Sequence, residues 1–341
     1  MTLPPLHGWL TSFGFTLLGR ADYLLPVLLA GLLLGEPFAR LLAFPGLRSA
    51  IGDLITRLGR KLNRTNRSIA TRLYRGIIAV IMLLVPAIAL GLFLMRRTGS
   101  VQLLATLLLV ALIGALVQPY TAWRQRRAAN RGTLALQSID PPYLFADSHG
   151  QLRYLILRHA SRFNLLVGSG FWFLLADLPG LLAYLMLAAA AAFYAPIQRE
   201  KLAFGWAASA LFKLLNIMPR CLSGLLCWLA AFFTPRTHPF AALGQTGRAG
   251  FLPTLLGLSL GGPMPSPAGE VNRPWAGSGN PKPIARDFSR LLQLLLAATL
   301  LLLLAIYGLT LGRELCAGCV TSQAPMRLSS NLHQTLRVPT P

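Results

Sequence analysis

The sequence is short of charged residues, and acidic side chains are the scarcest of them. Only 12% of the 341 residues are charged, and ten acids stand against 32 Lys and Arg. Soluble domains carry about a quarter charged residues, so the composition excludes an ordinary soluble protein. Carboxylates are the usual ligands of Mg²⁺ and common acid–base groups. The chain therefore offers few side chains for either kind of chemistry.

Cysteine is rare as well, and its spacing defines no disulfide framework. Cys221 and Cys227 lie in an apolar stretch and are expected to pack there. Cys316 and Cys319 form one CxxC without a second pair or a nearby His. Chance spacing in a polar tail is favoured over a zinc or redox site. The N-terminus lacks the basic start and cleavage site of a signal peptide, so we expect it to be retained.

Long apolar runs are plentiful, and they predict membrane spans. The runs 76–95, 101–123 and 291–312 are uncharged, and each is near the ~20 residues that a helix needs to cross the hydrocarbon. We predict an all-α fold, a polytopic integral membrane helical bundle with amphipathic surface helices and a long Gly/Pro-rich loop. The predicted spans lie near 15–35, 76–95, 101–123, 165–196, 205–233 and 291–312.

The net charge of +22 arises from cations that flank the apolar runs. Such cations orient a protein in the membrane and meet anionic headgroups, so membrane lipids are the expected partner and nucleic acid is not. The basic segments 36–75 and 124–164 are separated by two predicted spans and share one side. The positive-inside rule places that side in the cytoplasm, which predicts a multi-pass membrane protein with both basic segments on the cytoplasmic side.

Segment 36–75 has apolar residues at three- and four-residue steps between its arginines. This pattern is typical of an amphipathic helix on the membrane surface. A phosphate-binding site is the alternative interpretation. Segment 234–289 is rich in Gly and Pro and predicts a loop, which is either a solvated linker or a backbone surface that approaches a ligand. Residues 313–341 predict a disordered tail.

The apolar region 165–196 is interrupted at Asp177-Leu178-Pro179-Gly180. Either one long helix is kinked there, or two half-helices meet, which is tolerated only where protein or water covers the break. We favour Asp177 as a carboxylate at a helix end over a buried catalytic acid. The broken helix would also suit a secondary transporter, but no matching repeat is found in the rest of the chain.

The stretch 204–222 carries polar residues inside an apolar run. Four of them are spaced by four, three and four residues, which predicts one helical face: Ser209, Lys213, Asn216 and Arg220. A polar face on a membrane helix indicates a functional site. Pro219 has no N–H, so the carbonyl of Leu215 is predicted to need another partner.

Several motifs in order resemble one family. They are Gly35-Glu36-Pro37, Phe171-Trp172 with Leu178-Pro179-Gly180 and Tyr184, Phe204-Gly205-Trp206-Ala207-Ala208 with Leu214-Leu215-Asn216 and Pro219, and Gly261-Gly262-Pro263 with Arg273-Pro274-Trp275-Ala276-Gly277. Over roughly 20–310 the chain resembles the adenosylcobinamide-phosphate synthases (CobD/CbiB), membrane proteins of cobalamin biosynthesis. It departs from them in lacking most of their acidic residues: 157–168 has no carboxylate, with only Asn164 to stand for one, and Lys213 stands where the family has acid.

The resemblance implies a ligase that joins a carboxyl of adenosylcobyric acid to the amine of aminopropanol phosphate, with ATP and Mg²⁺ as cofactors if the activity is retained. It implies a corrinoid substrate, with Glu36 and Asn216 as catalytic residues. The implied substrate- or phosphate-binding residues are Arg220, Gly261, Gly262, Arg273 and Gly277. More distantly the chain resembles the AmpE-type inner-membrane proteins, so a non-enzymatic regulatory protein is the alternative function.

Overall fold

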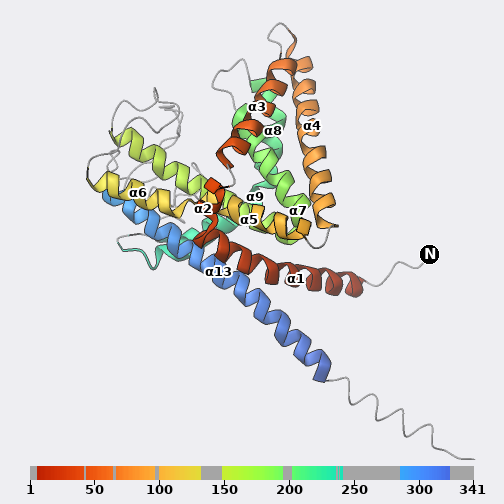
Figure 1. Cartoon of the computed structure of the whole chain (residues 1–341), viewed down its shortest axis with the longest axis vertical. Helices are drawn as coiled ribbons and strands as arrows, with labels where there is room; N and C mark the ends of the chain where they lie inside the picture. Colours follow the sequence, from red (N-terminus) through yellow and green to blue (C-terminus); the bar gives the residue numbers. More distant parts are fainter. Residues whose placement is uncertain are drawn as a thin grey trace, which may run out of the picture. The chain divides into compact units, whose positions relative to one another are not determined.

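The computed structural model describes ten helices that together form an all-α protein (Figure 1). Residues 6–41, 44–63, 67–96, 100–131, 148–194, 202–235, 237, 239–240 and 285–322 are described. The helices are α1 (Leu6–Leu33), α2 (Gly35–Leu41), α3 (Phe44–Leu62), α4 (Ile69–Met95), α5 (Ser100–Val117), α6 (Pro119–Asn130), α7 (Ser148–Tyr194), α8 (Leu202–Leu215), α9 (Ile217–Ala231) and α13 (Ala285–Ser322).

Four of the described helices are long and apolar enough to cross a membrane. They are Ile69–Met95, Thr106–Ala129, Arg158–Tyr194 and Ala285–Gly312. A fifth span is possible if the bent pair Ala203–Leu215 and Ile217–Ala231 forms one span. The predicted fold class, a polytopic all-α membrane bundle, is therefore confirmed. The predicted first span near 15–35 coincides with most of α1, which is not among the helices that meet these criteria.

Chain contacts divide the protein into two compact units. The larger unit is Val27–Leu302, and the smaller one holds the described residues of Met1–Pro26 and Leu303–Pro341. All the sites considered below lie in the larger unit.

One hydrophobic core of the larger unit joins α3, α4, α7 and α8, which lie together in Figure 1. Fully buried Ile55, Ala79, Leu187 and Ala208 meet there. Helices α4 and α8 touch through their backbones at Gly76, because a Cβ at this position would lie 2.2 Å from the carbonyl oxygen of Phe204.

A second core joins α7, α9 and the first half of α13. Ile156 and Phe163 of α7, Cys227 of α9, and Phe288 and Leu291 of α13 are buried in it. Cys227 is thus a packing residue, as the sequence predicts. The second core holds α9 against α7, and the first holds α8 against α7, so α7 carries both halves of the bent pair.

The basic segment 36–75 is divided among three helices. Helix α3 turns the apolar side chain of Ile55 into the first core, while Arg57, Arg60 and Lys61 are exposed. An amphipathic helix therefore forms here, but its apolar face packs against the protein core. The prediction that it lies on the membrane surface stays a prediction. Helix α4 begins at Ile69, seven residues before the predicted span, so the final arginines of the segment belong to its first two turns.

Candidate functional site

The bent pair α8–α9 breaks at Asn216, where the two helices meet at 52°. Pro219 removes the N–H that would bond to the carbonyl of Leu215. The indole Nε1 of Trp172 on α7 donates to that carbonyl instead, over 3.2 Å. The prediction that this carbonyl needs another partner is confirmed, and the partner is supplied by a different helix.

The bend also corrects the predicted polar face. Ser209 and Lys213 lie on α8, Asn216 is the residue between the helices, and Arg220 lies on α9. Because the helical direction changes at Asn216, the four residues do not form one face of a continuous helix, and that prediction is wrong. Pro219 and the packing of each half against α7 provide the physical reason.

The side chain of Asn216 is the centre of a hydrogen-bonded group that we call the amide cluster, formed by Asn164, Tyr184, Asn216 and Ser223. The Oδ1 atom of Asn216 accepts from Nδ2 of Asn164 at 3.2 Å and from the hydroxyl of Tyr184 at 2.9 Å. The hydroxyl of Ser223 donates to Oδ1 of Asn164 at 2.9 Å. The amide cluster joins α7 to the break and to α9, and it fixes the orientation of the Asn216 carboxamide.

Several donors near the break have no partner in the part of the chain that the structure describes. Nδ2 of Asn216 makes no hydrogen bond there, although the residue is half-buried. Lys213 and Arg220 are exposed on either side, and neither forms an ion pair with a described residue. An anion or a carbonyl oxygen is the group that such donors recognise.

Glu36, the acid of the Gly35-Glu36-Pro37 motif, lies at the start of α6. Its carboxylate is buried and accepts from the backbone N–H of Tyr120 at 2.8 Å and of Thr121 at 3.1 Å. The hydroxyl of Thr121 also donates to it. A negative charge at a helix N-terminus is favourable, and Gln118 before this helix has a left-handed backbone with φ 47°. Glu36 thus caps α6, while its catalytic role stays a prediction.

Helix α7 connects the Glu36 cap to the amide cluster. Nη1 of Arg162 donates to Oε1 of Gln118 at 2.6 Å, directly before α6. Asn164, two residues further along α7, belongs to the amide cluster. Gln118, which precedes the helix that Glu36 caps, and the amide cluster therefore contact residues two apart on the same helix. The described contacts do not bring Glu36 itself against Asn216.

Asp177 lies at a kink inside α7, where Ala176 and Asp177 leave the helical conformation and two helical segments meet. Its backbone has φ 58°, and its Oδ1 accepts from the N–H of Leu178 at 2.7 Å. The carboxylate therefore caps the helical segment that begins after the kink. This agrees with the favoured interpretation of Asp177 as a residue at a helix end.

The remaining predicted binding residues, Gly261, Gly262, Arg273 and Gly277, lie outside the described residues, as does most of loop 234–289. Among the residues that are described, no group of three or more His, Cys, Asp or Glu side chains could hold a metal ion. The described donor set therefore does not fit a Mg²⁺ site, and we derive no chemical step through Mg²⁺ or ATP.

Sequence reasoning did not identify the amide cluster as a unit. Tyr184 was noted only within a motif, Asn164 only as a stand-in for an acid, and Ser223 was not considered. Ser223 lies seven residues after Asn216, a spacing that returns to the same helical side. The other partners are joined across 52 and 32 residues, and no local pattern predicts such pairings.

Comparison with known proteins gives two relatives, both named cobalamin biosynthesis protein CobD. The one from Rhizobium meliloti (strain 1021) is 32% identical over 195 residues, which are 53% of this chain and 59% of the relative. The one from Sinorhizobium sp is 33% identical over 179 residues, 49% of this chain and 55% of the relative. The chain thus spans somewhat more than half the length of the curated relatives it matches.

No family model matches the chain, and no solved structure matches it. The names of the two relatives agree with the family that the motifs suggest. Of the motif residues, Trp172, Tyr184, Asn216 and Pro219 meet at the α8–α9 break. The resemblance inferred from the sequence is thereby confirmed over about half of the chain, which is similar there to the CobD family of cobalamin biosynthesis proteins.

Proposed function

We propose that this chain is a membrane protein of cobalamin biosynthesis that joins the amine of aminopropanol phosphate to a carboxyl of adenosylcobyric acid. The observation that carries the proposal is the meeting of Trp172, Tyr184 and Asn216 at the α8–α9 break. These residues carried the resemblance to the ligase family while lying far apart in the sequence. The names of the two relatives support the same pathway.

The donors at the break suit the two substrates in different ways. Nδ2 of Asn216 is fixed in direction, because Oδ1 of the same amide is held by Asn164 and Tyr184. We assign it to a carbonyl oxygen at the reacting carboxyl. Lys213 and Arg220 attract the phosphate of the aminopropanol substrate. Holding amine and carboxyl within near-attack distance accelerates amide formation without a covalent enzyme intermediate.

In the proposed reaction, the amine nitrogen attacks the activated carboxyl carbon. The C–N bond forms, the C–O bond to the activating group breaks, and the nitrogen releases one proton to solvent. ATP would supply that activation when bound. We assign orientation of the two substrates to the chain's described residues. We place the protein in the bacterial inner membrane with the segments 36–75 and 124–164 on the cytoplasmic side, as the positive-inside rule indicates.

The test is amide formation in membranes that contain the full chain. Membranes are incubated with adenosylcobyric acid, ATP and aminopropanol phosphate, and the amide product is followed by mass spectrometry. Product above that of membranes without the chain is expected. Absence of product from protein shown to be folded overturns the proposal. The same preparation then separates the alternative, since a non-enzymatic protein shows no ATP- or corrinoid-dependent rise in thermal stability.

A further inference from the structure

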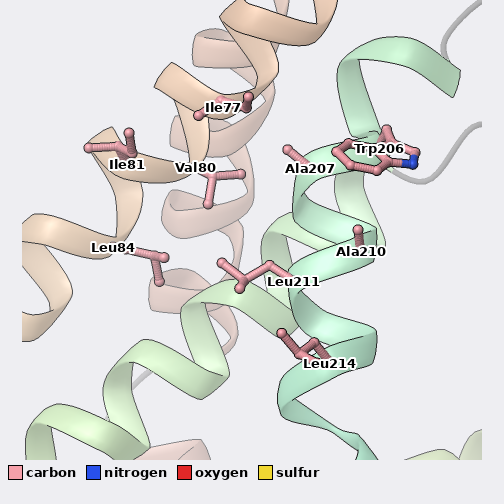
Figure 2. A pocket seen from close by; sticks show the side chains of 9 residues that line it. All are labelled: Ile77, Val80, Ile81, Leu84, Trp206, Ala207, Ala210, Leu211 and Leu214. Atoms are coloured by element: carbon pink, nitrogen blue, oxygen red, sulfur yellow. The ribbon is translucent and has the colours of Figure 1, made fainter.

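Helices α4 and α8 form an apolar groove on the surface of the larger unit, with a volume of about 370 Å³. Figure 2 shows Val80 and Leu84 of α4 on one side of the groove and Ala207 and Leu211 of α8 on the other, with Trp206 and Leu214 toward its two ends. The small alanine side chains leave the groove open, while the larger residues form its sides. Ile81, Trp206 and Leu214 are exposed, so the groove faces outward.

The groove lies at membrane depth. Helix α4 is one of the helices that can span the bilayer, and the groove follows it from Ile77 to Leu84. Seven residues of helix correspond to about 10 Å along the axis, which fits within one leaflet of a hydrocarbon core of about 30 Å. An outward apolar groove at this depth is in contact with hydrocarbon chains.

Aromatic side chains mark one end of the groove as the membrane interface. Tyr74 lies one turn before Ile77 on the same side of α4, because residues three apart share a helical face. Tyr74 and Trp206 are both exposed. Trp and Tyr are enriched at the level of the lipid headgroups. This end of the groove is therefore the end where a headgroup would lie.

Positive charge gathers at the same end. Arg60 and Lys61 end α3, and Arg67 precedes α4; all three are exposed, and none forms an ion pair with a described residue. Arg75, one residue after Tyr74, donates to the carbonyl of Leu62 and so ties the two helix ends together. No Asp or Glu occurs between residues 54 and 139 of the sequence. A headgroup bearing a net negative charge complements this end, and a zwitterionic headgroup complements it less.

We propose that the α4–α8 groove is a binding site for an anionic phospholipid, with an acyl chain between Leu84 and Leu214 and the phosphate at the cations Arg60, Lys61 and Arg67, which we call the basic turn. The site is independent of the reaction proposed above. Each Lys or Arg near an anionic headgroup strengthens its binding about fivefold, so the basic turn supplies the preference for anionic lipid and the groove supplies the affinity for the chain.

The test uses the full chain, purified in detergent and examined by native mass spectrometry with added phosphatidylglycerol or phosphatidylcholine of identical acyl chains. The wild type is expected to retain one phosphatidylglycerol at least about 25-fold better than phosphatidylcholine, because at least two cations face the headgroup. Ala210→Phe fills the groove and should abolish retention of both lipids. The matched control is Ala89→Phe, which adds the same ring at an exposed position of α4 outside the groove.

A second pair of variants tests the charge. Arg60→Gln with Arg67→Gln should reduce retention of phosphatidylglycerol about 25-fold and leave that of phosphatidylcholine unchanged. Arg124→Gln with Arg131→Gln removes two exposed cations elsewhere and should change neither. Trp206→Ala removes the large side chain at the upper side of the groove. It takes the place of Ala210→Phe in the lipid-retention comparison if Ala210→Phe does not fold. Equal retention of the two lipids by the wild type, retention by folded Ala210→Phe, or a protein dimer in place of bound lipid would overturn the proposal.

Discussion

Two helices of this protein are broken, and the two breaks are completed differently. In α7 the break at Ala176–Asp177 is capped from within, since Oδ1 of Asp177 accepts from the next residue in the chain. At the α8–α9 break the partners come from another helix. Trp172 of α7 supplies the missing donor to Leu215, and α7 also supplies two of the four residues in the amide cluster.

The difference indicates which break is built for function. A cap from the neighbouring residue solves a local backbone problem. The α8–α9 break instead brings together polar side chains separated by 32 to 59 residues, and it leaves the Nδ2 of Asn216 without a partner in the described part of the chain. Polar groups inside a membrane protein are costly and usually functional. We therefore assign function to the α8–α9 break and a structural role to the kink in α7.

The largest effect is expected from Asn216→Ala. The change removes the acceptor of both Asn164 and Tyr184, which should cost about 1–3 kcal/mol of stability. It also removes the oriented amide, for which we expect a loss of amide formation of about 100-fold. Thermal unfolding in detergent and the membrane assay measure the two effects. Ser209→Ala is the control, because Ser209 lies on α8 and outside the amide cluster. Its rate of amide formation should stay within about twofold of that of the wild type. If both changes had equal and small effects, the polar residues would have a role in helix packing only.

The bond between Trp172 and Leu215 gives a sharper test, since it depends on Pro219. Trp172→Phe leaves the Leu215 carbonyl without its donor and should cost about 1 kcal/mol. In a Pro219→Ala background the restored backbone N–H can serve that carbonyl, and the same change should cost close to nothing. The double-mutant cycle in thermal unfolding should therefore yield a coupling of about 1 kcal/mol. Additive effects would show that the proline and the indole are unrelated.

Tyr184→Phe removes one of the two donors to Asn216 and keeps the ring. The buried ring packs beside Phe212 of α8, so the change should leave the core in place and cost about 0.6 kcal/mol. Because the Asn216 amide is then held by Asn164 alone, amide formation should fall several-fold while stability changes little. Unchanged activity at this reduced stability would speak against an orienting role of the amide cluster.

The smallest effect is expected from Asp177→Gly at the other break. The change removes the side-chain cap, but glycine adopts the observed φ of 58° without the steric cost of a Cβ. These two effects oppose each other, so stability should change by less than about 1 kcal/mol. Amide formation should remain within about twofold of the wild type. A large loss of activity from folded protein would move the functional assignment to the kink in α7.

The fold class could be predicted from the sequence because each membrane span is visible as one continuous apolar segment. Runs of about 20 apolar residues and a proline beside an orphaned carbonyl are local features, and both predictions are confirmed. The motifs likewise led to the family resemblance that the two relatives support.

The amide cluster could not be predicted in this way, because it depends on how α7 packs against both halves of the bent pair. The spacing of Ser209, Lys213, Asn216 and Arg220 predicted a shared face by assuming a straight helix, and the bend at Asn216 removes that assumption. Glu36 was predicted from its motif as catalytic, while its observed contacts are those of a helix cap, which depend on α6 lying beside α2.

Amide formation by the wild type, Asn216→Ala and Asp177→Gly, measured side by side in membranes and normalised to folded protein, tests the central claim most directly. The account predicts that wild type and Asp177→Gly make the product from adenosylcobyric acid and aminopropanol phosphate at rates within about twofold, and that Asn216→Ala falls about 100-fold below them. Product formation by folded Asn216→Ala at the wild-type rate would contradict it.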